Sequence, residues 1–296
     1  MPPTPTPTSN PSFQPLAGVR VLSLALNLPG PAALMRCRQM GADCVKLEPP
    51  GGDPMASYSR PAYDQLHEGI RTLLADLKSE AGRRILHSEL LAADVLLTSF
   101  RPSALRKLGI GWGALQRQYP ALSQIALVGS PGEQAEKPGH DLTYLAESGL
   151  VPGLELPATL YADMSGSLMA SEAVMQAVLA QRSQSKGVFI EIALAQAAAY
   201  LALPRHWGLT QAAGPVGGAH AGYRIYPCQD GRVAVAALEP HFAAALCAAA
   251  GVSSSGVRAM MAPATRQKIA DFLLTQTRDQ LDTLAFTKDI PLHTMA

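Results

Sequence analysis

Short apolar runs alternate with longer amphipathic stretches along the first part of the chain. Val19 to Ala25 ("VRVLSLA") is rich in β-forming residues, and a break at Asn27 to Pro31 precedes "AALMRCRQM", a predicted helix that ends at Gly41. "ADCVKLEPPGG" then predicts a second short strand, which stops at Pro49 to Gly52. Strand, helix and strand within about 30 residues is typical of a βαβ unit, in which the two strands are parallel.

The same alternation continues through the next part of the chain. The pattern predicts a helix over Glu80 to Ala92, a strand at "DVLLTSF", a helix over Ser103 to Gln118 and a strand at "QIALVG". This repetition predicts an α/β fold, with a large doubly wound, Rossmann-like parallel-sheet domain over residues 16–207. Ligands of such sheets bind beyond the carboxyl ends of the strands. The segments expected at that edge are Asn27–Pro31, Pro49–Gly52, Phe100–Arg101 and Gly129–His140.

The remainder of the chain predicts a smaller α+β domain. A long apolar helix over Ser165 to Arg182 and the strand "VFIEIAL" still belong to the large domain, and the glycine-rich stretch 208–222 is a predicted linker. Residues 223–296 begin with two β-rich runs around Gln229–Gly231, which is a hairpin signal. Helices are expected after the hairpin, around His241–Ala250, Ala264–Thr277 and Asp279–Ala285.

Composition narrows the class of protein. Lys plus Arg number 24 and Asp plus Glu 23, so the net charge of +1 favours neither nucleic acid nor a membrane surface as a partner. No run of apolar residues reaches the roughly 18 that suggest a membrane span. The four cysteines have no zinc-binding spacing, which favours a reduced, cytoplasmic protein without a metal. Residues 1–15, where Pro and Thr alternate, are expected to form an extended tail outside the fold.

Three features are candidates for catalysis, and each has a structural alternative. His140 stands in "GHDLTY" and Asp163 in "LYADMSGSLM", while Glu239 precedes Pro240 in "AALEPHF". An aspartate before a helix is usually an N-cap, and a glutamate before an N1 proline usually belongs to a helix start. A histidine beside an aspartate at a helix start is usually a solvated loop residue. Taken singly, these residues do not decide between structure and catalysis.

The order of longer segments resembles one known family. The opening "LAGVRVLSLALNLPGPAALMRCRQMGADCVKLEPPGGDP" is followed in turn by "ADLKSEAGRRIL", "ADVLLTSFRPSALRKLGIGWGAL" and "CQDGRVAVAALEPHF". These segments resemble, in order and spacing, the class III CoA-transferase (CaiB/BaiF-like) superfamily, which includes the 2-methylacyl-CoA racemases. The resemblance covers nearly everything from Leu16 onward.

The resemblance implies roles for the three candidates. Asp163 matches the catalytic aspartate that the family shares, which is a nucleophile in transferases and an acid/base group in racemases. Gly139-His140-Asp141 matches the motif of the second racemase acid/base group, and Glu239-Pro240 matches the motif of a supporting glutamate. The presence of all three favours a racemase-like enzyme that epimerises the α-carbon of an acyl-CoA. Backbone N–H groups at the start of the helix after Asp163 are expected to stabilise the enolate.

Two other activities stay open. One is transfer of CoA between carboxylic acids through an aspartyl intermediate, and the other is CoA binding without catalysis. The resemblance implies that no cofactor is required, because coenzyme A belongs to the substrate. It also implies a homodimer in which Glu239 comes from the second subunit.

Coenzyme A carries phosphates, which need cations and close backbone approach. Arg101 at a predicted strand end is the first candidate, and further candidates follow it along the next helix and in the first βαβ unit. They are Arg38, Lys46, Pro49, Gly51, Arg106 and Lys107. Arg106 and Lys107 can equally belong to a solvated helix face. No GxGxxG fingerprint is present, which disfavours a nicotinamide-dependent dehydrogenase.

The chain departs from the family in three places. The loop between His140 and Asp163 is shorter than in racemases, and the segment after Asp163 ("DMSGS") contains less glycine. The sequence ends at "TKDIPLHTMA", whereas family members run on and return to the large domain, so a shortened C-terminus is expected.

Overall fold

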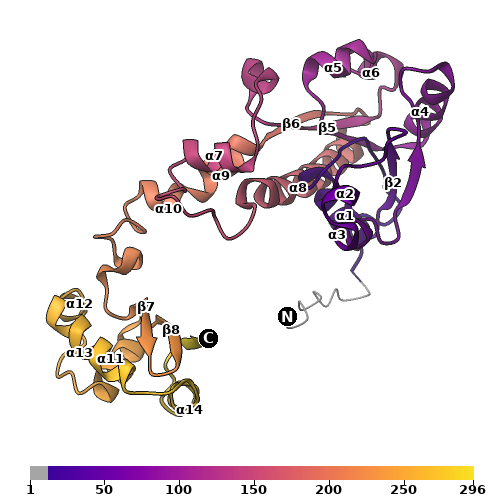
Figure 1. Cartoon of the computed structure of the whole chain (residues 1–296). Helices are drawn as coiled ribbons and strands as arrows, with labels where there is room; N and C mark the ends of the chain where they lie inside the picture. Colours follow the sequence, from indigo (N-terminus) through magenta and orange to yellow (C-terminus); the bar gives the residue numbers. More distant parts are fainter. Residues whose placement is uncertain (1–12) are drawn as a thin grey trace. The chain divides into compact units, whose positions relative to one another are not determined.

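The chain divides into two compact units, Met1–Ala202 and Leu203–Ala296 (Figure 1). The computed structural model describes residues 13–296, so residues 1–12 of the predicted Pro/Thr tail lie outside the described residues. The stretch 208–222, which was predicted to be a linker, lies in the second unit.

A six-stranded parallel sheet forms the centre of the first unit, as the alternating pattern predicted. Its strands are β1 (Arg20–Ser23), β2 (Asp43–Glu48), β3 (Arg71–Leu74), β4 (Val95–Thr98), β5 (Ser123–Val128) and β6 (Phe189–Ala193). The strand order is β3-β2-β1-β4-β5-β6, and all neighbours are parallel. The direction of winding reverses between β1 and β4, which is where doubly wound folds bind their ligands.

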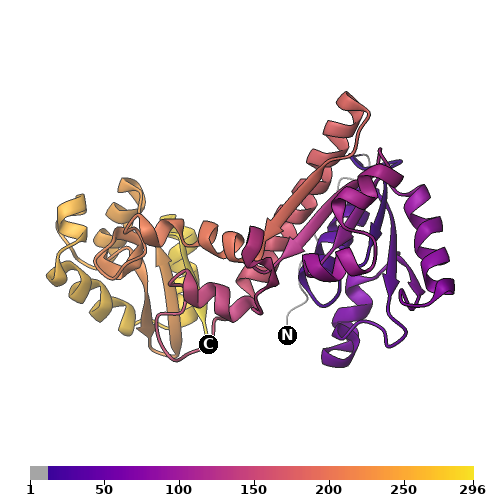
Figure 2. The same ribbon diagram turned by 90° about the horizontal axis from the view of Figure 1, so that it is seen from above.

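Helices cover both faces of this sheet. They are α1 (Pro29–Gln39), α2 (Met55–Tyr58), α3 (Arg60–Leu66), α4 (Glu80–Ala92), α5 (Pro102–Lys107), α6 (Trp112–Gln118), α7 (Asp141–Glu147), α8 (Tyr161–Gln184) and α9 (Leu194–Leu201), with a 3-10 turn η1 (Gly132–Glu136). Residues of α1 and α8 share one apolar core with alternate residues of the strands, and residues of α4, α5 and α6 share the other (Figure 1). Figure 2 shows the long α8 running beside β6, which it contacts. No helix within residues 13–296 is both long and apolar enough to cross a membrane.

Three details differ from the sequence prediction. The single helix expected over 103–118 is two helices, because Gly109 adopts φ 75° and the chain turns there before α6 begins. Strand β3 was not predicted, since its short run is only partly buried at the sheet edge. Helix α8 begins at Tyr161, four residues before the predicted start at Ser165. This earlier start changes the position of Asp163 in the helix.

The second unit is built on a small antiparallel sheet of order β7-β8-β9. Strands β7 (Tyr223–Cys228) and β8 (Gly231–Ala236) form the predicted hairpin, and β9 (Leu292–Met295) adds an edge strand that was not predicted. The helical segments are α10 (Leu203–His206), α11 (Pro240–Ala249), α12 (Val257–Met260), α13 (Pro263–Leu274) and α14 (Arg278–Lys288), with a kinked turn η2 (Pro215–Ala219). Residues of the sheet and of α11 to α14 share one apolar core. The expected fold class, a parallel α/β domain with a smaller α+β domain, is therefore confirmed.

Candidate active site

A cavity of about 530 Å³ opens where β1, β4 and β5 end at the carboxyl edge of the sheet. This is the point where the winding of the sheet reverses. Three residues predicted from the sequence line the cavity, namely Arg101, His140 and Asp163. Most other lining residues come from the loops after these three strands and from the first turns of α2, α7 and α8, while Leu127 and Val128 of β5 and Leu194 of α9 also line the cavity.

Asp163 lies in the first turn of α8, at its third residue. The residue that precedes the helix is Leu160, so the alternative that Asp163 is an N-cap is wrong. The backbone N–H of Asp163 donates a hydrogen bond of 3.0 Å to Oδ1 of Asp141, whose side chain is buried at the start of α7. This bond connects the first turn of α8 to the first turn of α7.

The carboxyl group of Asp163 has an unusual proton affinity. Burial raises its pKa to about 6, the negative charge of Asp141 adds to the rise, and His140 acts in the opposite direction. A carboxyl with this pKa can both accept and release a proton close to neutrality. The environment of Asp163 therefore suits acid/base chemistry.

His140 is the residue that directly precedes α7. Its backbone is extended (φ −143°), and its N–H donates a hydrogen bond of 3.1 Å to Oγ1 of Thr143. The residue as a whole is exposed and lines the cavity. Backbone and side chain thus have separate roles, since the backbone begins the helix while the imidazole faces the same cavity as Asp163.

Tyr144 is a member of this site that the sequence did not single out. Its side chain is buried, and burial raises the pKa of its phenol, with a further contribution from the charge of Asp163. A Cβ added to Gly129 or Gly139 would lie 2.2 or 2.5 Å from its hydroxyl oxygen. The two glycines therefore leave room for Tyr144. Its position one helical turn after His140-Asp141 is the signal in the sequence that could have suggested it.

The expected backbone donors for an enolate are not available where the sequence placed them. The N–H of Asp163 is bonded to Asp141, and the N–H of Met164 is bonded to the carbonyl of Leu160 at 3.0 Å. Because α8 begins before Asp163 rather than after it, these two amides are already satisfied.

Lys46, which the sequence offered as a CoA-binding residue, lies inside the protein and does not line the cavity. Its side chain is fully buried, and Nζ is 3.1 Å from Oε1 of Glu48 and also contacts a carboxylate oxygen of Asp53. Glu48, Asp53 and His67 form the one group within residues 13–296 whose spacing could hold a metal ion, and the ammonium group of Lys46 contacts all three. A residue enclosed in this way cannot reach a phosphate.

Four other predicted CoA-binding residues lie away from the cavity. Arg38 is on α1, where Nε donates a hydrogen bond of 3.0 Å to the carbonyl of Gly69. Pro49, Gly51 and Lys107 are exposed, but none of them lines the cavity. Arg101 is thus the predicted cation that the fold brings to this site.

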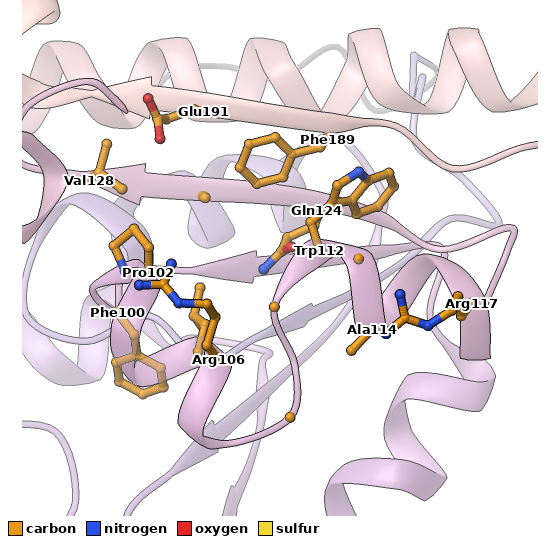
Figure 3. A pocket seen from close by; sticks show the side chains of 15 residues that line it. Phe100, Pro102, Arg106, Trp112, Ala114, Arg117, Gln124, Val128, Phe189 and Glu191 are labelled. Atoms are coloured by element: carbon orange, nitrogen blue, oxygen red, sulfur yellow. The ribbon is translucent and has the colours of Figure 1, made fainter. Parts of the chain in front are cut away.

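Arg106 lines a second cavity, of about 450 Å³, on the sheet face beside α5 and α6 (Figure 3). Its Nη2 is 3.6 Å from Oε1 of Glu136. The rings of Trp112 and Phe189 meet at a centroid distance of 5.9 Å, and the amide of Gln124 lies close by (Figure 3). The two cavities share Phe100 and Val128 in their walls.

Glu239 belongs to the second unit, where it directly precedes α11 with Pro240 as the first helical residue. Its side chain is exposed and makes no capping hydrogen bond to the helix. Glu239 therefore lies at a helix start, as the structural alternative held, but its carboxylate does not cap that helix.

The fold is that of an α/β protein with a cavity at the switch point of a doubly wound sheet. Residues 16–295 match the family CoA-transferase family III, and the chain belongs to that family, as the resemblance implied.

Individual relatives have different activities. The chain is 29% identical over 285 residues to human "Alpha-methylacyl-CoA racemase", in an alignment that covers 89% of this chain and 73% of that protein. It is 37% identical over 150 residues to "Cinnamoyl-CoA:phenyllactate CoA-transferase" of Clostridium sporogenes, which covers 46% of this chain and 36% of that protein. Family membership therefore leaves the specific reaction undecided.

The fold is shared with solved structures. A hypothetical protein of Mycobacterium tuberculosis superimposes with a TM-score of 0.81 at 22% identity, covering 94% of this chain and 82% of that chain. At this level of identity the likeness concerns the fold alone.

Proposed function

We propose that this protein epimerises the α-carbon of an acyl-CoA thioester, as 2-methylacyl-CoA racemases do. The observation that carries the proposal is that one cavity brings together His140 and an aspartate, Asp163, whose pKa is raised to about 6. The alignment with the human racemase supports it, because it extends over 89% of this chain.

The reaction needs one group on each face of the α-carbon. The thioester carbonyl acidifies the α-hydrogen, because the electron pair left behind spreads onto the carbonyl oxygen as an enolate. The carboxylate of Asp163 takes the proton from one face, and the imidazolium of His140 donates a proton to the other face. The opposite enantiomer uses the two groups in reverse, and exchange with solvent restores their protonation states. Every step is a proton transfer between the α-carbon and one of these two groups, and no electrons are exchanged, so the proposed reaction needs no redox or metal cofactor.

Charge around the cavity supports an anionic substrate and intermediate. Asp163 is in the first turn of the 24-residue helix α8, whose N-terminus favours nearby negative charge such as that of an enolate. Arg101 is exposed at the cavity wall after β4, where a guanidinium can bind a phosphate group of coenzyme A. Lys137 is a second cation on the same wall.

CoA transfer between carboxylic acids is the second candidate, and the 37% identity to a CoA-transferase supports it. In that reaction the carboxylate of Asp163 attacks the thioester carbonyl, and CoA leaves as a thiolate. The thiolate then attacks the aspartyl carbonyl of the mixed anhydride and releases the donor acid, which leaves CoA bound to the aspartyl group as a thioester. The acceptor carboxylate attacks this aspartyl thioester, and the released thiolate attacks the acceptor carbonyl of the new anhydride, which gives the new acyl-CoA and regenerates the Asp163 carboxylate. This chemistry requires Asp163 but does not require a proton donor on the opposite face of the α-carbon.

Incubation with a 2-methylacyl-CoA in deuterated water separates these activities. Epimerisation is expected to replace the C2 hydrogen with deuterium, which proton NMR detects, and to interconvert the two enantiomers. Transfer of CoA to an added carboxylic acid without label at C2 would instead establish the transferase. Binding of the thioester in calorimetry with neither reaction would establish a CoA-binding protein without catalysis.

Substitutions at the pair test the assignment of roles. Asp163→Asn is expected to abolish both reactions, whereas His140→Gln should reduce epimerisation by about 10²-fold or more and affect transfer much less. His206→Gln, at an exposed histidine of α10, is the matched control and should leave the rate unchanged. Glu239→Gln tests the supporting role implied for that residue, and light scattering tests the expected homodimer.

A further inference from the structure

Lys46 lies at the centre of a buried polar cluster beside the active-site cavity. Its Nζ is 3.1 Å from Oε1 of Glu48 and 2.7 Å from Nε2 of His67, and it contacts Oδ2 of Asp53. All four side chains are buried. The sequence pattern does not predict this arrangement, because a lysine near the end of a strand is usually exposed to solvent.

The hydrogen bonds of this cluster have a determined direction. Nδ1 of His67 is 2.6 Å from the carbonyl oxygen of Tyr63, which can only accept, so the ring carries its proton on Nδ1. Nε2 then accepts from the ammonium group of Lys46. Burial lowers the pKa of His67, which agrees with a neutral ring. The three N–H bonds of Lys46 thus find three acceptors, in Glu48, Asp53 and His67.

The ammonium group takes the place that a metal ion would have. Two carboxylates and an imidazole whose ligand atoms lie within 4.8 Å of one another are a common donor set for a divalent cation. Here the single positive charge of Lys46 balances part of the negative charge of the two carboxylates. The other hydrogen-bonding positions of their oxygen atoms are occupied by donors of the protein. Glu48 accepts from the hydroxyl of Tyr63 at 3.0 Å and from the N–H of Asp53 at 3.2 Å.

Asp53 connects this cluster to the active-site cavity. While Oδ2 faces Lys46, Oδ1 accepts hydrogen bonds from the backbone N–H of Asn27 at 3.0 Å and of Met55 at 2.9 Å. Asn27 adopts φ 66°, a left-handed conformation that non-glycine residues hold only where other contacts fix it. Asn27 and Met55 both line the cavity that contains His140 and Asp163.

We propose that Lys46 and Asp53 are positioning residues, which act together to fix the Asn27 and Met55 backbone in the wall of the acyl-CoA site. Lys46 holds the Asp53 carboxylate in place as an internal cation, and Asp53 holds the two backbone segments. Without the cation, two buried carboxylates remain side by side, and one must take up a proton or turn toward solvent. Either change releases the amides of Asn27 and Met55.

Amide hydrogen exchange measures this release directly and needs no substrate. In Lys46→Met and in Asp53→Asn, the amides of Asn27 and Met55 are expected to exchange about tenfold faster or more, as the loss of a charge-assisted hydrogen bond implies. Because the two residues act as one unit, the double variant should exchange little faster than either single variant. If Lys46→Met does not fold, Asp53→Asn alone decides the outcome.

Glu89→Gln is the matched control. Glu89 is a mostly buried carboxylate that pairs with Arg20 at 2.7 Å, and Arg20 begins β1 at the opposite edge of the sheet. This variant is expected to lower stability without accelerating exchange at Asn27 or Met55. Equal acceleration in Glu89→Gln, or unchanged exchange in both the Lys46 and Asp53 variants, would overturn the proposal.

The kinetic consequence rests on the function proposed above. A loosened wall must be ordered when substrate binds, so KM for the acyl-CoA should rise about tenfold while kcat changes much less. Faster exchange without any change in acyl-CoA binding would leave the positioning role intact and would count against the assignment of this cavity to acyl-CoA. The two proposals therefore fail in distinguishable ways.

Discussion

The backbone N–H of Asp163 donates a hydrogen bond of 3.0 Å to Oδ1 of Asp141, so two aspartates face each other at the first turns of α8 and α7. This contact has two effects. It fixes the start of α8 beside His140, and it places a second negative charge next to the carboxyl group of Asp163, which contributes to the raised pKa of that group.

Asp141→Asn separates these two effects. Asparagine keeps an oxygen that can accept from the N–H of Asp163 but removes the charge, so the pKa of Asp163 should fall below about 6. Burial is the larger cause of the shift, so the pKa should stay above the ordinary value of 3.8. Carboxyl carbon chemical shifts followed through a pH titration measure the change. A pKa that does not move would show that Asp141 acts on Asp163 only through the hydrogen bond.

The same shift predicts how stability depends on pH. The folded state raises the pKa of Asp163 from 3.8 to about 6, so folding disfavours the ionised form and lowers stability above pH 6. Asp163→Asn removes this penalty and should raise the free energy of unfolding at pH 8 by up to about 3 kcal/mol. The advantage should shrink as the pH falls through 6 and vanish below about 4, where both states are protonated. Urea unfolding across this range gives the measurement, and a gain independent of pH would contradict the assignment.

Gly129→Ala and Gly139→Ala should differ in how far a second substitution, Tyr144→Phe, restores their stability. A Cβ at Gly129 would lie 2.2 Å from the hydroxyl oxygen but 3.2 Å from the next ring atom, whereas a Cβ at Gly139 would lie 2.7 Å and 2.8 Å from ring carbons as well. Gly129→Ala and Gly139→Ala should each be destabilising by about 1–3 kcal/mol, through overpacking. Adding Tyr144→Phe should restore most of the loss at Gly129 and little of it at Gly139. Thermal unfolding of the four variants tests this, and equal rescue at both glycines would contradict the packing described.

The sequence predicted five of the six strands of the parallel sheet, because these strands and the helices between them have strong local signals. The helix Glu80–Ala92 was predicted with its exact bounds, and Ser79 caps it by accepting a hydrogen bond from the N–H of Gly82. The break at Gly109 was missed, since a single glycine in an amphipathic stretch does not reveal a positive φ. Local pattern describes elements, whereas their ends depend on individual backbone conformations.

The candidate site was predictable only in part, because local sequence patterns do not contain tertiary contacts. His140, Asp163 and Arg101 lie at the carboxyl edge that the topology defines, and the cavity brings them together. Lys46 was predicted as a candidate for binding coenzyme A, but it faces Glu48, Asp53 and His67 inside the protein. Its partners are distributed over a strand, a loop and a helix end, so the burial of its charge depends on tertiary contacts that no local pattern contains.

Gln124 gives a last prediction, at the second cavity. Its side chain is 1% exposed, and neither Nε2 nor Oε1 has a hydrogen-bond partner within the described part of the chain. A buried amide without partners is destabilising, whereas methionine has nearly the same length and no strong hydrogen-bonding group. Gln124→Met should therefore raise the free energy of unfolding by about 1 kcal/mol, while Gln116→Met at an exposed position of α6 should change it by less than about 0.5 kcal/mol. Denaturant unfolding of the two variants provides the comparison. A loss of stability in Gln124→Met alone would contradict the description of this amide as a destabilising group without partners.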